Sequence, residues 1–258
     1  ASIVILKAKN YKLDIDYCSS NSNEISIYTK MDEYLRIKND GFKIVKVQNE
    51  HSVTHRNNFI KKGKYRHQKD LYKFIINLKN KYSDIFNYEI IGKTKENREI
   101  FITQTTLIKN KDYKPSFLLV ANIHGDETLG REISLYFMDY LCYQYDKDIA
   151  IKNIVDNFNI YILPSLNPDG FERTLLGRWT PSRYNSNGID LNRNFPDQFK
   201  TNDVKRELEV EAVINWSKKN QVHLSLSIHG GALVVNYPYD GPTTGIYSKC
   251  PHDNYFKY

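Results

Sequence analysis

The sequence lacks any run of about 18 consecutive apolar residues, so we expect no segment of it to span a membrane. Its cysteines, Cys18, Cys142 and Cys250, cannot all pair within one molecule and show no C-x-x-C spacing for zinc or redox chemistry. The first residues lack both an initiator methionine and the basic-then-apolar layout of a signal peptide, which suggests a processed or trimmed start.

The sequence also has little clustering of charge, although Lys and Arg outnumber Asp and Glu by 37 to 30 and the formal charge is +7. Short basic runs such as Lys61–Arg66 are not accompanied by a DNA or RNA motif, so we expect a solvated basic surface and no nucleic-acid partner. Hydrophobic residues make up 40% of the 258 positions and aromatic residues 13%, which is enough for a sizeable folded core.

Two units are predicted along the chain. Residues 1–64 have a strand, helix and strand pattern at 2–7, 31–37 and 42–47, which indicates a small α/β unit loosely similar to an activation segment. Residues 65–258 then form a larger domain, and the polar stretch 51–66 connects the two.

The larger domain alternates strands with helices, which predicts an α/β fold with a doubly wound, mixed sheet and helices on both faces. Near-continuous apolar runs indicate strands buried on both faces, and a charged turn between two short β-rich segments indicates a hairpin. The helices are expected at 68–82, 131–145 and 205–220, and the strands at 88–91, 100–105, 116–123, 159–166, 222–228 and 232–237.

Two histidines and one glutamate have the spacing of zinc ligands. His124 and Glu127 are three positions apart on a short turn, and His229 lies far along the chain. Two histidines and a glutamate form a known catalytic zinc set, although an isolated H-x-x-E also arises by chance. Because each histidine follows a predicted strand of one sheet, the fold is expected to bring both to the same edge. The sequence therefore predicts one Zn²⁺ per chain.

Four motifs in one order resemble the zinc metallocarboxypeptidases, and most closely their regulatory branch, which includes carboxypeptidases N, D, E and M. The motifs are HGDE at 124–127, NPDG followed by Phe171 and Glu172, DLNRNFP at 190–196, and HGGALVVNYPYD at 229–240. The resemblance begins near Arg66 and runs to the last residue. It implies a carboxypeptidase-like fold that is incomplete at its C-terminal end.

The resemblance also implies roles for individual residues. Asp190 matches the carboxylate that receives the other ring N–H of a zinc-bound histidine, although a turn or helix-cap residue would look the same. Arg183 matches the arginine that stabilises the developing oxyanion, with Arg178 as the alternative. Asn192 and Arg193 match the pair that binds the free C-terminal carboxylate of a substrate, for which a planar guanidinium is well suited. A surface salt bridge is the simpler explanation of Arg193.

The implied function is a zinc-dependent exopeptidase that removes one C-terminal residue from peptides or proteins by metal-activated water. Asp240 matches the acidic residue associated with a preference for C-terminal Lys or Arg, although a plain turn residue is the alternative. The general-base glutamate and a capping tyrosine are expected beyond Tyr258, so the chain is interpreted as part of a longer enzyme with little turnover alone. A catalytically inactive, carboxypeptidase-like binding module is the alternative function.

Two further expectations concern the surroundings of the domain. The resemblance to the regulatory branch favours a secreted protein or one in the secretory pathway, and the sequon at Asn215 is compatible with this, although it lies in a predicted helix. Asn97 stands where the family usually has glycine before an arginine in a turn. Because asparagine tolerates the left-handed backbone conformation, the turn is expected to survive.

Overall fold

The computed structural model describes residues 14–18, 25–28, 39, 65–109, 112–175, 182–197, 199, 204–239 and 248–256. It divides into two compact units, one of residues 53–230 and one of residues 1–52 together with 231–258. The predicted boundary between residues 64 and 65 stays a prediction.

The unit of residues 1–52 and 231–258 contains an antiparallel pair, β1 (Asp14–Cys18) and β2 (Ile25–Tyr28), and the short helix α10 (Asp253–Phe256). The elements that the sequence predicts at 2–7, 31–37 and 42–47 lie outside the described residues. The strand predicted at 232–237 is wrong, because the described backbone there forms no strand. Its apolar side chains, such as Leu233 and Val235, are exposed and not packed in a sheet.

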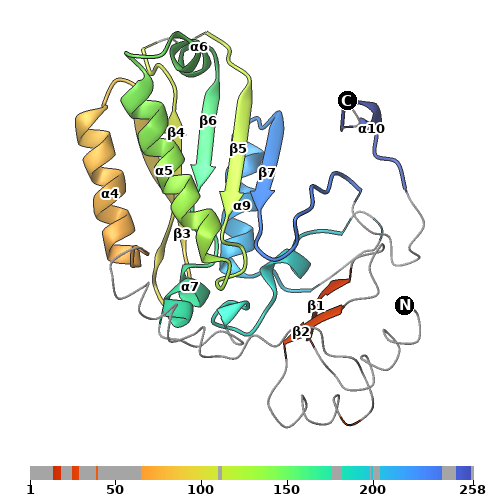
Figure 1. The fold of residues 1–258 in the computed structure, drawn as a ribbon. Coiled ribbons are helices and arrows are strands. Elements are labelled where there is room, and N and C mark those ends of the chain that lie inside the picture. The colour runs from red at the N-terminus through yellow and green to blue at the C-terminus, as the bar shows by residue number, and fades with distance from the viewer. Residues whose placement is uncertain are drawn as a thin grey trace. The chain divides into compact units, whose positions relative to one another are not determined.

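The unit of residues 53–230 is built on a five-stranded mixed sheet of order β3-β4-β6-β5-β7 (Figure 1). Neighbouring strands are antiparallel from β3 to β6, and β5 runs parallel to both β6 and β7. The strands are β3 (Phe86–Lys93), β4 (Glu99–Thr105), β5 (Ser116–Ala121), β6 (Asn159–Leu163) and β7 (Leu224–Ile228).

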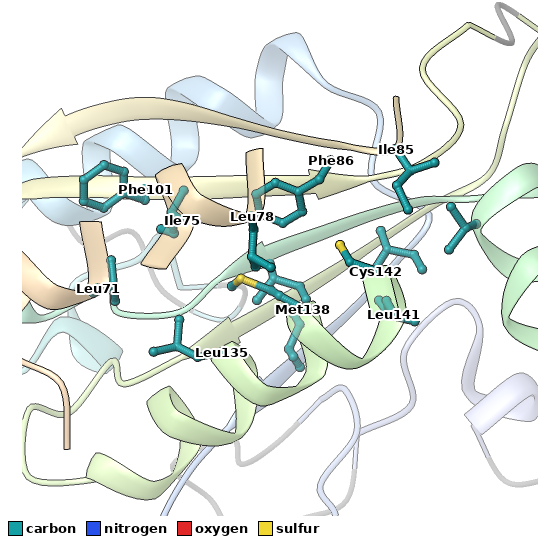
Figure 2. Packing of buried hydrophobic residues seen from close by; sticks show 14 residues of the cluster. Leu71, Ile75, Leu78, Ile85, Phe86, Phe101, Leu135, Met138, Leu141 and Cys142 are labelled. Atoms are coloured by element: carbon teal, nitrogen blue, oxygen red, sulfur yellow. The ribbon is translucent and has the colours of Figure 1, made fainter. Parts of the chain in front are cut away.

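Helices lie on both faces of this sheet, as predicted: α4 and α5 on one face and α9 on the other (Figure 1). Each face has its own apolar cluster. The first includes Leu71 and Ile75 of α4 with Leu135 and Met138 of α5, and Figure 2 shows their packing. The second joins Val210 and the neighbouring residues of α9 to the opposite face of the sheet. The helices are α4 (Gln68–Lys81), α5 (Thr128–Gln144), α6 (Ile149–Asn157), α7 (Pro168–Leu175), the 3-10 turn η1 (Leu191–Arg193) and α9 (Leu208–Lys219).

Two helices differ from what the sequence suggests. The NPDG segment is not only a turn: α7 begins at Pro168, and proline is well suited to the first position of a helix because its missing N–H needs no partner there. Helix α6 was not predicted, and it begins where the Asp148 carboxylate accepts hydrogen bonds from the N–H groups of Ala150 and Ile151.

The turn between β3 and β4 confirms the expectation for Asn97. This residue has a φ of 62°, in the left-handed region that asparagine tolerates better than most residues. The N–H of Thr94 donates to the carbonyl of Arg98 at 2.9 Å, so the hairpin closes without the glycine usual in the family.

Candidate metal and active site

Two neighbouring parallel strands bring the predicted histidines to one edge of the sheet. The last residue of β5, Ala121, is paired with the last residue of β7, Ile228. His124 follows the first strand closely and His229 follows the second directly. The carboxyl ends of parallel strands are the usual place for a ligand site in such sheets.

Both predicted histidine ligands contact the third predicted ligand, Glu127. Its carboxylate contacts Nδ1 of His124 at 2.8 Å through one oxygen and Nδ1 of His229 at 3.0 Å through the other. The ligand atoms of the three residues lie within 4.8 Å of one another. Bonds of about 2.0–2.1 Å to a tetrahedral zinc place ligand atoms about 3.3 Å apart, so small adjustments would accommodate the ion. The residues present fit a zinc ion.

Asp190 contacts the nitrogen of His124 that faces away from Glu127. The distance from Nε2 to Oδ1 is 3.1 Å, so a proton on Nε2 leaves Nδ1 free for a metal. Asp190 also accepts a hydrogen bond from the N–H of Asn192 at 2.9 Å and caps η1. Its position therefore fits both the role that the resemblance implies and the simpler cap.

The charges of these groups suit a cation. Burial disfavours the charged form of Glu127, but hydrogen bonds with both histidines outweigh this effect and lower its pKa to about 2. The pKa of Asp190 is held well below its usual range, because contacts with His124 and Arg183 outweigh burial. Burial acts to lower the pKa of His124, but its contacts with Asp190 and Glu127 raise it overall. Both carboxylates are therefore ionised at neutral pH.

Two glycines allow the ligand loop to approach α7 and Arg183 closely. A Cβ atom on Gly125 would lie 2.3 Å from the backbone of Gly170 and 2.3 Å from the carbonyl oxygen of Ser182. The carbonyl of Arg183 accepts hydrogen bonds from the N–H of Gly125 at 3.4 Å and from Nδ2 of Asn167 at 3.2 Å. The HGDE and NPDG motifs are thus in direct backbone contact.

Of the other predicted site residues, three lie near the metal ligands in the structure and two lie outside the described residues. The guanidinium of Arg183 donates to Asp190 at 3.1 Å, and one third of its side chain is exposed. Asn192 and Arg193 lie in η1 with exposed side chains, and Arg193 donates to the carbonyl of Asn192 at 3.1 Å. Asp240, and Arg178 as the alternative to Arg183, lie outside the described residues.

The sequence analysis missed Asn122 and Asn167, which lie just beyond β5 and β6 and hold the site by hydrogen bonds. Asn122 donates to the carbonyl of His124 at 2.8 Å, and Asn167 donates to Arg183. Both side chains are fully buried. The sequence shows only an asparagine near the end of an apolar run, and the burial that gives it a role is visible only in the structure.

Comparisons with known proteins identify the family of this chain. The zinc carboxypeptidase family matches residues 71–258. Mouse carboxypeptidase M is 39% identical over 204 residues, which cover 76% of this chain and 46% of the relative. Human carboxypeptidase D is 37% identical over 75% of this chain and 14% of its own length. The mouse carboxypeptidase N catalytic chain is 31% identical over 77% of this chain and 52% of its own length.

Solved structures show the same fold at lower identity. Carboxypeptidase A from Helicoverpa armigera has a TM-score of 0.69 and 18% identity, and the match covers 88% of this chain and 66% of that one. The present chain spans about half the length of carboxypeptidases M and N, and 14% of the length of human carboxypeptidase D. Every helix in the described part of the chain is too short or too polar to span a membrane. The chain belongs to the zinc carboxypeptidase family, a family that uses Zn²⁺, and its relatives are of the regulatory type.

Proposed function

We propose that this chain carries the metal and carboxylate-binding part of a metallocarboxypeptidase site, which removes one residue from the C-terminus of peptides or proteins. The convergence of His124, Glu127 and His229, with Asp190 on the outer nitrogen of His124, is the observation that supports this function most directly. These three residues would bind one zinc ion. Zinc in such a site lowers the pKa of a water molecule and polarises a carbonyl group.

The chain's own side chains would hold the substrate around the metal. The Arg183 guanidinium is fixed by Asp190 and partly exposed, so it can offer a preorganised positive charge to a carbonyl oxygen that becomes negative. Asn192 and Arg193 are exposed just beyond Asp190, and they would bind the free carboxylate of the last substrate residue. An enzyme that requires this free carboxylate cleaves only at the C-terminus and is therefore an exopeptidase.

Two finer parts of the proposal depend on the relatives and on sequence. A preference for C-terminal Lys or Arg would come from Asp240, whose carboxylate would attract a cationic side chain. The resemblance to carboxypeptidases M, D and N supports this preference and a place in the secretory pathway. The sequon at Asn215 begins on an exposed side chain, but it lies within α9.

The carboxylate clamp can be tested apart from turnover. Zinc-loaded protein is titrated with a peptide that ends in arginine, either with a free carboxylate or with an amidated C-terminus. We expect the wild type to prefer the free carboxylate by about 10-fold or more, since a charge-assisted pair contributes about 1.5–3 kcal/mol. Arg193→Ala is expected to remove this preference, whereas Lys219→Ala, an exposed cation on α9, leaves it unchanged.

An equal affinity of the wild type for both peptides would contradict the exopeptidase clamp. Release of arginine is followed in the same samples with and without chelator. We expect little release, because Glu127 is assigned to the metal, which leaves the described site without an assigned general base. Efficient, chelator-sensitive release would contradict that expectation but support the proposed enzyme class.

A further inference from the structure

A buried hydrogen-bond relay joins α5 to the backbone of the ligand loop. Nη1 of Arg131 donates to Oγ of Ser165 at 2.9 Å, and that hydroxyl donates to Oδ1 of Asn122 at 2.7 Å. Nδ2 of Asn122 then donates to the carbonyls of His124 at 2.8 Å and Gly125 at 3.2 Å. Arg131 and Asn122 are fully buried, and Ser165 is 3% exposed.

The chemistry of these groups allows only one direction for the relay. A guanidinium has donors and no acceptor, so Ser165 must accept from Arg131 and is free to donate its own proton onward. That proton satisfies the amide oxygen of Asn122, which turns the amide NH₂ group toward the loop carbonyls. The orientation of the Asn122 amide is therefore set by the charge of Arg131, through Ser165, and not by the loop alone.

Arg131 is itself held firmly. It also donates to the carbonyl of Arg66 at 2.9 Å and to the side chain of Gln68 at 3.1 Å, and its guanidinium lies 3.8 Å from the ring centre of Phe171. Burial lowers its pKa to about 10, so it stays charged at neutral pH. A buried charged group needs hydrogen-bond partners in the protein, and these partners fix the position of the Arg131 guanidinium at the start of the relay.

The receiving end of the relay is a tight turn. Asn122 has a φ of 55°, in the left-handed region, and its amide spans the carbonyls of the residues that follow. A loop closed in this way has few alternative conformations, so the directions of the His124 and Glu127 side chains are set by its backbone.

We propose that Arg131, Ser165 and Asn122 are positioning residues, which hold the ligand loop so that His124 and Glu127 face each other before the metal binds. This inference rests on the proposed zinc site. None of the three residues contacts a ligand side chain in the described hydrogen bonds, so their effect would pass through the backbone carbonyls.

The test uses variants of the 258-residue chain that remove single links of the relay. Asn122→Gly removes the amide but still permits a positive φ, and Ser165→Ala removes one hydroxyl. Thr103→Val is the matched control, because the Thr103 hydroxyl is also fully buried but donates to the carbonyl of Ile162 in the sheet at 3.2 Å. Zinc affinity is measured by chelator competition at a temperature where circular dichroism shows every metal-free variant folded.

We expect zinc affinity to fall by about 10-fold or more for Asn122→Gly and Ser165→Ala, the range seen when partners that orient ligands are removed. Thr103→Val is expected to bind zinc as the wild type does. The absorption spectrum of the cobalt-loaded protein is expected to change in the two relay variants even at saturation, because the ligand directions differ. A purely structural role would lower stability without changing that spectrum.

The outcomes separate the two proposals. Suppose that the wild type binds zinc and that both relay variants show its zinc affinity and its cobalt spectrum. That result would overturn the positioning role alone. Failure of the wild type to bind zinc would overturn the metal site, and the positioning role with it. If Asn122→Gly does not fold, Ser165→Ala decides the result.

Discussion

The two histidines of the metal site lie at the ends of adjacent strands but in different surroundings. His124, beyond β5, is 3% exposed, and each of its ring nitrogens contacts a carboxylate. The side chain of His229, beyond β7, is 35% exposed, and its second nitrogen lies 3.4 Å from the hydroxyl of Ser227. Among the described strands, β7 pairs with β5 alone. One ligand is therefore preorganised by the fold, whereas the other depends more on the metal itself.

The strongest test of this difference is to remove each histidine in turn. His124→Ala and His229→Ala are each expected to lower zinc affinity by more than about 100-fold, beyond the range for residues that only orient ligands. In the metal-free protein, His124→Ala is expected to lower the free energy of unfolding by about 2 kcal/mol, because two charged groups lose a hydrogen-bond partner. His229→Ala is expected to lower it by less, about 1 kcal/mol, because only Glu127 loses a hydrogen-bond partner to a charged group there.

Urea unfolding in the presence of chelator measures the metal-free stabilities. Equal losses in the free energy of unfolding for the two variants would show that the fold holds both histidines equally firmly. The difference between the ends of β5 and β7 would then not exist.

A smaller effect is expected at the partners of the two rings. Asp190→Asn is expected to lower zinc affinity by about 10-fold to 100-fold, because the amide cannot replace the negative charge that orients His124 and increases its basicity. Ser227→Ala is its counterpart, and we expect a loss below about threefold because a contact of 3.4 Å is long for a hydrogen bond. Chelator competition measures both, and comparable losses would contradict the comparison.

The smallest effect is a change of stability with pH. The pKa of His124 is raised above its ordinary 6.5, so its contribution to metal-free stability is present below that pH and is lost as the pH rises through the raised value. The pKa of Glu127 is lowered from 4.5 to about 2, so its contribution is present above pH 4.5 and is lost as the pH falls toward 2.

Zinc binding has the opposite dependence at the histidines, because a metal needs the unprotonated ring. Above pH 6.5 we therefore expect the metal-free protein to become less stable while the stabilisation by zinc increases. Thermal unfolding of both forms across this range measures the effect. A metal-free stability that rises with pH over the same interval would contradict the raised pKa of His124.

Much of the fold followed from the sequence because the strands and helices have clear hydrophobic patterns. The apolar run before His124 predicted a buried strand, and the segment before His229 predicted a further strand. Their parallel pairing then placed both histidines at one edge. The apolar pattern at 232–237 misled because hydrophobicity alone does not provide a partner strand. Helix α6 was missed because its N-cap, Asp148, became informative only with the hydrogen bonds that it accepts.

The metal ligands were recognisable because ligand chemistry restricts residue types and spacing, whereas their supports were not. Asn122 and Ser165 lie far apart in the sequence, and either could have been an ordinary polar residue at a strand end. Arg131 lies on the buried face of α5 with Leu135 and Met138, and burial of a charge is visible only when its partners are known. Hydrogen-bond relays therefore remain largely hidden from pattern reading.

The close contact between Gly125 and Gly170 has a consequence for protein engineering. A methyl group on Gly125 would lie 2.3 Å from the backbone of Gly170, and one on Gly170 would lie 2.4 Å from the carbonyl oxygen of Ser182. The loop that carries His124 and Glu127 is therefore shaped against the start of α7 and the carbonyl of Ser182, so it cannot be transplanted alone. A working graft of this half of the metal site would have to carry the HGDE segment, the NPDG segment and the strand ends beneath them as one piece.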